Sequence, residues 1–195
     1  MHTDITGDAA PPPQLYITGC TRMQGFWTAG SNGDELFLVF SGVHNTSYPR
    51  TDPVVISVVI SPDNTRMLLG RKKQFPSTMY SCLAGFMEPG ESVEEAARRE
   101  IKEESGVDVG EVTYVSSQPW PYPAVLMIGC VSRAKTEMIE ICTEELEDAK
   151  WFDIEDVRKG INNESSVLAI PPPETIAHQL IKSWLSKNNS RQSKI

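Results

Sequence analysis

Short runs of apolar residues separated by turn residues recur along the chain from position 54 onward, and they predict a domain built mainly of strands. Val54 to Ile60 is an apolar run interrupted only by Ser57, which predicts a strand buried on both faces. Turn residues follow at 61–64, before apolar residues return. Further strands are expected at 35–40, 67–69, 79–84, 112–116, 125–131 and 149–152.

Three segments have the patterns of helices. Ser92 and Glu95 form a capping box that predicts a helix over 92–105, and Gly106 suits the position that ends it. A short helix is expected at 153–159, and a closing helix at 175–185 follows three consecutive prolines at 171–173. Strands that alternate with a few helices around one sheet predict an α/β sandwich.

The ends of the chain have weaker patterns than the middle. Residues 1–13 finish in three prolines and predict a flexible lead-in, whereas residues 14–46 contain a turn-rich stretch at 30–34 and are otherwise ambiguous. Residues 187–195 are polar and predict a flexible tail. The length of 195 residues therefore allows one domain of ordinary size with a small extension.

The charge balance restricts the partners of this protein. The net charge is -8, without a long basic run, so non-specific binding to duplex DNA or to anionic lipid is not expected. The longest apolar run is also far too short to span a bilayer, so no membrane partner is expected. An acidic protein that handles phosphates needs metal ions to mask the like charges.

The four cysteines (Cys20, Cys82, Cys130 and Cys142) form no CxxC pair and no recognisable disulfide framework. We therefore expect reduced thiols in an intracellular compartment. The first thirteen residues lack the basic and apolar regions of a signal peptide.

The segment Gly85 to Val107 concentrates the chemistry. On the predicted helix, Glu100, Glu103 and Glu104 project within about one third of a turn of one another, because successive residues are roughly 100° apart. Carboxylates on one stripe repel each other unless a cation lies between them, and oxygen ligands suit Mg²⁺ or Mn²⁺. Arg99 is placed one turn before Glu103 and is expected to hold that carboxylate.

An acidic, solvated helix face is the simpler explanation of such a charge run. That explanation must also account for Gly85, Glu91, Arg99 and Gly106, which occur together with the carboxylates at fixed spacing. The glycines at 85 and 90, with Pro89, let the preceding loop fold tightly onto the helix. We therefore favour a metal-dependent site that activates water for attack on phosphorus.

A second motif lies at 117–123, where three prolines alternate with Trp120 and Tyr122. Proline fixes φ, so a stiff loop after the preceding strand is expected. Such a loop could present its aromatic rings as a stacking platform for a heteroaromatic base, or it could be a structural loop with the rings packed on the core. The spacing alone leaves both alternatives open.

The spacing from Gly85 to Val107 matches the Nudix box, and the string Ser117 to Pro123 resembles the signature of NADH pyrophosphatases within the Nudix superfamily. The stretches 48–53, 83–86 and 176–180 are similar to the same family, and the resemblance covers about 42–185, closest to its animal peroxisomal branch. It implies a Nudix fold, an α/β/α sandwich around a mixed sheet, over residues 47–186.

The resemblance also implies roles for individual residues. Glu100, Glu104 and the backbone carbonyl of Ala84 resemble the metal ligands of the family, and Glu145 resembles a further one outside the box. Glu103 resembles a ligand or the base, and the implied catalytic residues are Glu103, Glu104 and Arg99. The implied substrate-binding residues are Tyr48, Phe86, Gln118, Pro119, Trp120, Pro121, Tyr122, Pro123, Ala124, Val125 and Ala177.

The sequence departs from this family upstream of Tyr48. Relatives have a four-cysteine zinc ribbon there, whereas here Cys20 stands alone and Ile17 occupies the place of its CxxC partner. We therefore interpret 1–46 as a lead-in followed by a degenerate ribbon-like segment, and we expect zinc ligands to be absent. The resemblance also implies a homodimer.

The activity implied is hydrolysis of NADH, NADPH and related dinucleotides to reduced nicotinamide mononucleotide and AMP. Removal of NAD caps from RNA is the alternative within the enzyme class, and a truncated, non-catalytic Nudix binding module is the alternative outside it. The chain ends in Ser193-Lys194-Ile195, one conservative step from the peroxisomal Ser-Lys-Leu signal. This predicts recognition by a peroxisomal import receptor, and an ordinary tail on a cytoplasmic protein is the alternative.

Overall fold

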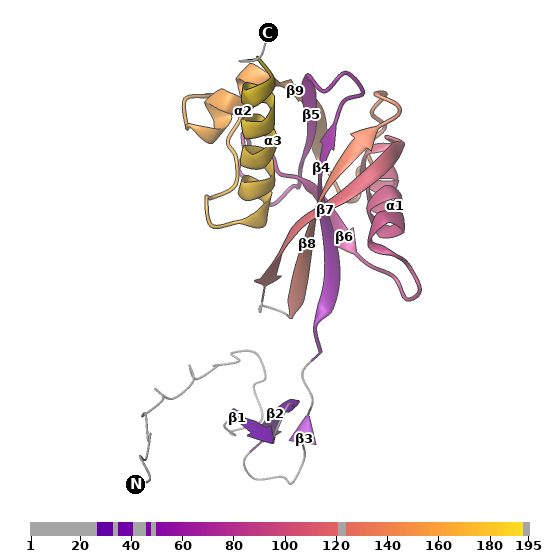
Figure 1. Cartoon of the computed structure of the whole chain (residues 1–195), viewed down its shortest axis with the longest axis vertical. Helices are drawn as coiled ribbons and strands as arrows, with labels where there is room; N and C mark the ends of the chain where they lie inside the picture. The colour runs from indigo at the N-terminus through magenta and orange to yellow at the C-terminus, as the bar shows by residue number, and fades with distance from the viewer. Residues whose placement is uncertain (1–26, 33–34, 41–45, 48–49, 121–123, 193–195) are drawn as a thin grey trace, which may run out of the picture. The chain divides into compact units, whose positions relative to one another are not determined.

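The computed structural model of this chain describes residues 27–32, 35–40, 46–47, 50–120 and 124–192 (Figure 1). The chain divides into two compact units, 1–50 and 51–195. The predicted boundary at 46/47 lies close to this division. Among the described residues, no helix has the length and the apolar character needed to cross a membrane.

The first unit contains a three-stranded antiparallel sheet. Its strands are β1 (Trp27–Asn32), β2 (Glu35–Phe40) and β3 (Thr46–Ser47), in the order β1-β2-β3. The pairs Trp27 with Phe40 and Asn32 with Glu35 show that β1 and β2 form a hairpin. The strand predicted at 35–40 is confirmed, whereas Ile17, Cys20 and Tyr48 lie outside the described residues.

The second unit contains a six-stranded mixed sheet. Strands β7 (Val109–Trp120), β8 (Val125–Ala134), β4 (Asp52–Ile60), β5 (Arg66–Arg71) and β9 (Asp148–Asp153) follow one another across it. The short strand β6 (Leu83–Phe86) pairs with β4. The β4–β8 pair is parallel, and the other pairs are antiparallel.

The central strand β4 is buried on both faces, as its apolar run, interrupted only by Ser57, predicts. Its alternating side chains supply two separate cores, because successive residues of a strand point to opposite faces. Ile56, Val58 and Ile60 join one hydrophobic cluster, whereas Val59 joins another. The sheet therefore needs a covering layer on each side.

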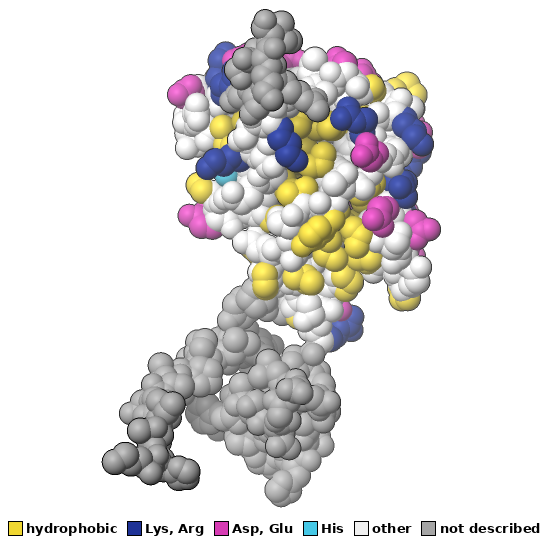
Figure 2. Space-filling view, viewed as in Figure 1, with side chains coloured by type: hydrophobic (Ala, Val, Ile, Leu, Met, Phe, Trp, Pro, Cys, Tyr) yellow, Lys and Arg dark blue, Asp and Glu magenta, His cyan; other side chains and the backbone are white. Residues whose placement is uncertain are grey.

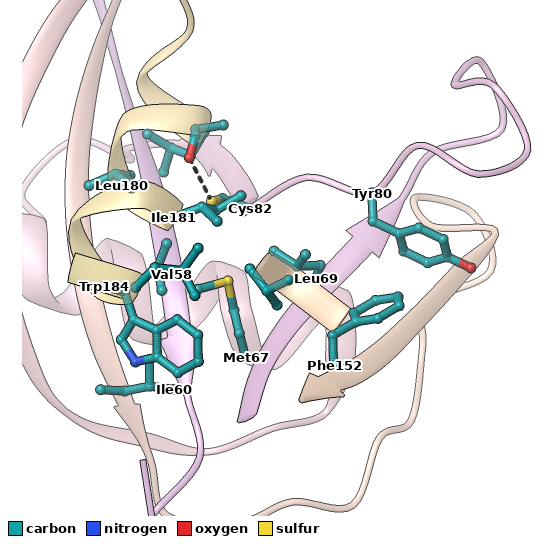
Figure 3. Packing of buried hydrophobic residues seen from close by; sticks show 14 of the residues in the cluster. Val58, Ile60, Met67, Leu69, Tyr80, Cys82, Phe152, Leu180, Ile181 and Trp184 are labelled. Carbon is teal, nitrogen blue, oxygen red and sulfur yellow. Dashed lines mark hydrogen bonds between the residues drawn. The ribbon is translucent and has the colours of Figure 1, made fainter. Parts of the chain in front are cut away.

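Helices provide these layers. Helix α1 (Val93–Ser105) covers the Val59 face, where its Ile101 is buried. Helices α2 (Ile154–Ile161) and α3 (Ile176–Gln192) cover the opposite face. Figure 3 shows Ile181 and Trp184 of α3 packing against Val58, Ile60 and Met67 of the sheet. The predicted α/β/α sandwich is thus confirmed.

The predicted ends of α1 are also confirmed. The Ser92 hydroxyl accepts a hydrogen bond from the backbone N–H of Glu95, and the Glu95 side chain accepts one from the backbone of Ser92. Gly106 closes the helix in the left-handed conformation, with φ 75°, and its N–H donates to the Lys102 carbonyl. Residues of other types rarely adopt this φ, which explains the glycine.

Three elements differ from the predictions. The segment predicted as a strand at 79–84 makes single bridges from Met79 to Ala169 and from Ser81 to Gly70, because it contacts two different partners in turn. Only 83–86 forms a ladder. Helix α3 continues to Gln192, so the tail expected to be flexible from Lys187 is helical up to that residue.

The third difference concerns the stiff loop predicted at 117–123. Strand β7 continues through Trp120, and Pro119 pairs with Leu126 inside it. Proline has no N–H to donate to a neighbouring strand, so within sheets it is confined largely to edge strands. Among the described strands, β7 lies at the edge of the sheet and pairs only with β8. Residues 121–123 lie outside the described part.

Candidate active site

Helix α1 places two carboxylates against strand β6. Glu104 is only 1% exposed, and its Oε2 atom accepts a hydrogen bond of 3.3 Å from the backbone N–H of Ala84. Glu100 lies one turn earlier, where its carboxylate occupies the space that a Cβ atom on Gly85 would fill. The glycine of the box is therefore required by the approach of Glu100.

The backbone of Ala84 faces the same two carboxylates. Ala84 pairs with Ile56 of β4, but its N–H points away from β4 toward Glu104. The N–H and C=O of one residue in a strand point to the same side. The Ala84 carbonyl oxygen is therefore on the side of the glutamates, as the predicted ligand role requires.

The environment of these carboxylates opposes their ionisation. Burial raises the pKa of Glu104 to about 7, and the negative charges of Glu100 and Glu145 act in the same direction against Lys72. Burial also raises the pKa of Glu100, although the Arg99 guanidinium opposes this effect. Two desolvated carboxylates that repel each other are a donor set that a divalent cation stabilises.

Arg99 organises the outer side of the helix. Its Nε and Nη2 atoms donate to both oxygens of Glu91, at 2.6 and 2.9 Å, and Nη2 also donates to the Phe86 carbonyl. Its Nη1 atom donates to Glu100 and Glu103, at 2.7 and 3.0 Å. The carboxylates of Glu91, Glu100 and Glu103, Glu91 most of all, raise the pKa of Arg99.

The predicted pairing of Arg99 with Glu103 is confirmed, but Arg99 makes two hydrogen bonds to Glu91 and only one to Glu103. The Nε, Nη1 and Nη2 atoms of Arg99 all donate hydrogen bonds to acceptors of the protein itself. Arg99 therefore acts by holding the carboxylates in position. Glu103 itself is 54% exposed at the side chain. The three carboxylates thus differ in their surroundings: Glu104 faces β6, Glu100 contacts both β6 and Arg99, and Glu103 contacts Arg99 and is exposed.

Within the described residues, no three His, Cys, Asp or Glu side chains stand close enough together to hold a metal ion as they are arranged. Glu145 is exposed, and it is near enough for its charge to act on both Glu100 and Glu104. The donors nevertheless fit a divalent cation, because Glu100, Glu104 and the Ala84 carbonyl supply oxygen from one side.

A pocket of about 470 Å³ adjoins these carboxylates. Glu104 and Ala84 line it, together with Lys72, whose Nζ atom is 3.7 Å from Glu104 Oε1. The rest of the lining is mainly apolar. Its apolar residues are Ile56, Phe75, Met79, Cys82, Leu83, Trp120, Met127, Leu146, Pro171, Pro172, Ile176 and Ala177, and the remaining ones are Gly70, Ser81, Gln118 and Thr175. The pocket is thus apolar over most of its lining and acidic on one side, where Glu104 and, one turn earlier on α1, Glu100 form what we call the acidic wall.

Only some predicted substrate-binding residues line this pocket. Gln118, Trp120 and Ala177 do, and Trp120 is 46% exposed. Phe86 is 55% exposed and, with Pro119, Ala124 and Val125, does not line the pocket. Tyr48 and the range 121–123 lie outside the described residues. Figure 2 shows hydrophobic side chains gathered near the middle of one face of the second unit.

Sequence reasoning missed Lys72 and Phe75 as pocket residues. Both follow strand β5 in the segment that leads to β6, and the sequence marks it only by the basic run 71–73. That run lies far from the box in sequence, and its proximity to Glu104 results from the pairing of the strands.

The fold and the carboxylate site agree with the comparison with family models: the NUDIX domain model matches residues 51–169, so this chain belongs to the Nudix family. It is 56% identical over 149 residues to the NAD-capped RNA hydrolase NUDT12 of Macaca fascicularis, covering 76% of this chain and 32% of that protein. It is 45% identical over 151 residues to the mitochondrial NAD(P)H pyrophosphatase NUDT13 of Mus musculus, covering 71% and 42%.

Among solved structures, the chain is similar to the crystal structure of a NUDIX hydrolase from Nitrosomonas europaea, with a TM-score of 0.58. The two are 18% identical, and the match covers 88% of this chain and 92% of that chain. At this identity the likeness concerns the fold alone. The chain spans less than half the length of the curated relatives it matches.

Proposed function

We propose that this chain hydrolyses the diphosphate of NADH, NADPH and related dinucleotides, giving reduced nicotinamide mononucleotide and AMP from NADH. Water adds to one phosphorus, the bridging P–O bond breaks, and the two mononucleotides leave. The observation that supports this most is the juxtaposition of the Glu100–Glu104–Ala84 donor set with an apolar pocket. The names of the similar proteins support the choice of substrate.

The residues of the acidic wall would hold Mg²⁺ or Mn²⁺. Glu100, Glu104 and the Ala84 carbonyl are the proposed ligands, and Glu103 and Glu145, whose negative charges act on Glu100, are further candidates. The bound ions would neutralise the diphosphate and activate the attacking water. Arg99 keeps Glu100 and Glu103 oriented through its hydrogen bonds, so its contribution is positioning.

The apolar pocket is the proposed site of a heteroaromatic ring of the dinucleotide. Its volume of about 470 Å³ lies in the range of small-molecule pockets. Trp120 stands at its edge with nearly half of its side chain exposed, which suits stacking on a flat ring. Lys72, partly exposed beside Glu104, is available to an anionic phosphate.

Removal of NAD caps from RNA is the second candidate, because NUDT12 of Macaca fascicularis is named as an NAD-capped RNA hydrolase. The same bond would be cut. The net charge of -8 makes a long RNA the less favourable ligand. A Nudix domain that binds its ligand without hydrolysing it is the non-catalytic alternative, and the intact set of carboxylates on α1 argues against it.

The deciding experiment is turnover with a panel of dinucleotides and an NAD-capped RNA, in the presence of Mg²⁺ or Mn²⁺, with release of AMP or of the decapped RNA measured. Glu104→Gln should nearly abolish turnover while the circular dichroism spectrum is kept, because losing a ligand charge costs several kcal/mol of transition-state stabilisation. Glu94→Gln, an exposed change on the same helix, is the matched control. Wild-type turnover in a folded Glu104→Gln protein would refute the proposed site.

A further inference from the structure

Four consecutive backbone carbonyls, those of residues 171–174, each accept a hydrogen bond from a side chain. The donors are His178 Nδ1 to Pro171 at 2.9 Å, the Thr175 hydroxyl to Pro172 at 2.8 Å, Gln179 Nε2 to Pro173 at 2.6 Å and Gln118 Nε2 to Glu174 at 2.7 Å. Three of these residues are prolines and have no N–H of their own. The segment before α3 is therefore held through its carbonyls.

Gln118 differs from the other three donors because it comes from a distant strand. His178, Thr175 and Gln179 belong to α3 or to the residue before it, whereas Gln118 lies on β7, 56 residues from Glu174. Its Oε1 atom also accepts a hydrogen bond of 2.8 Å from the Ile176 N–H. The backbone partners fix the orientation of the amide, because an N–H can only donate and a carbonyl can only accept.

This double hydrogen bond connects two walls of the pocket. Gln118 and Trp120 are two residues apart on β7, so both side chains point to the same face, and both line the pocket. Pro171, Pro172, Thr175, Ile176 and Ala177 line it from the other side. The two hydrogen bonds of the Gln118 amide, to Glu174 just before α3 and to Ile176 at its start, thus set the distance between Trp120 and the wall formed by 171–177.

We propose that Gln118 is a positioning residue that fixes the width of this pocket and thereby the affinity for the ring of the substrate. The inference rests on the proposed function of the same site. It assigns the polar atoms of Gln118 to the protein backbone, in place of the direct substrate contact that the sequence predicts. The side-chain hydrogen bonds of Gln118 go to Glu174 and Ile176 and not to the carboxylates Glu100 and Glu104. Gln118 therefore affects binding of the substrate and leaves the chemical step unchanged.

Gln118→Met tests this, because methionine keeps the length of the side chain and removes both hydrogen bonds. Two ordinary hydrogen bonds correspond to an effect of roughly ten-fold, so we expect KM for NADH to rise by about that factor while kcat stays within about two-fold. Gln118→Glu is a second variant that stays polar but no longer donates to Glu174, and KM should rise in it as well. Gln74→Met, at an exposed position outside the pocket, is the matched control and should behave as wild type.

Hydrogen exchange of the Ile176 amide gives a readout that needs no activity. Exchange should become faster in Gln118→Met and stay unchanged in Gln74→Met. An unchanged KM in a folded Gln118→Met protein, an equal fall in kcat, or unchanged exchange at Ile176 would overturn the inference. If the wild-type protein releases no AMP from any dinucleotide, the proposed function fails, and the exchange measurement alone decides whether Gln118 holds the wall.

Discussion

Gly85 and Glu100 fit together so closely that one dictates the identity of the other. The Glu100 carboxylate lies where a side chain on residue 85 would begin, so only glycine is compatible with this packing. Glu100 approaches β6 because α1 packs against that strand through its buried face. The pair therefore joins the first glycine of the box, which lies in strand β6, to the proposed metal ligand, across 15 residues of sequence.

Gly85→Ala should displace Glu100 and reduce turnover by roughly two orders of magnitude, because a misplaced ligand loses much of its effect on the transition state. The same clash should lower the free energy of unfolding by about 1–3 kcal/mol. Denaturant unfolding and AMP release measure the two effects. The double variant Gly85→Ala/Glu100→Ala should regain stability and remain inactive. If Gly85→Ala alone has wild-type stability and turnover, the close packing is not important.

The stability of the metal-free protein should depend on pH through Glu104. Its pKa is about 7 in the folded protein and about 4.5 when unfolded, so the folded state retains a proton that the unfolded chain releases in this window. The free energy of unfolding should therefore fall as pH rises from about 4.5 to about 7, with a slope of up to about 1.4 kcal/mol per pH unit from this group.

Urea unfolding at several pH values, with a chelator present, measures this slope. Glu104→Gln should reduce it, because glutamine does not titrate, and Glu94→Gln should leave it as in wild type. Equal slopes in Glu104→Gln and wild type would show that the burial of Glu104 does not raise its pKa.

Trp120→Ala should raise KM for dinucleotides by roughly five-fold, since a stacked ring contributes on the order of 1 kcal/mol. Tyr114→Ala is the matched control, because Tyr114 is also an exposed aromatic residue of β7 but does not line the pocket. Steady-state kinetics with several dinucleotides measures both. Unchanged kinetics in Trp120→Ala would leave the ring with a structural role alone.

A fluorescent protein fused before this chain should show a punctate peroxisomal pattern, because the chain ends in Ser193-Lys194-Ile195. Deleting these three residues should make the fusion diffuse, and Ile195→Leu should strengthen import. These residues lie outside the described part of the structure. A fusion that is diffuse with the tail intact, or punctate without it, would contradict the targeting prediction.

The sequence by itself determined the features that arise within one helix or one strand. The cap at Ser92, the ending at Gly106 and the Arg99–Glu103 pair follow from spacing along α1, because positions three and four apart share a helix face. The apolar run of β4 likewise specifies a strand buried on both sides.

Only the tertiary structure decided how distant segments meet. The pairing of β6 with β4 brings the Ala84 N–H to Glu104, and Lys72 reaches the same carboxylate from the segment after β5. The extension of β7 through Pro119 and the attachment of Gln118 to α3 depend on the edge position of β7 and on the docking of a helix across the sheet. Such contacts have no local pattern, because the order and register of the strands, which no single segment encodes, set the distances between them.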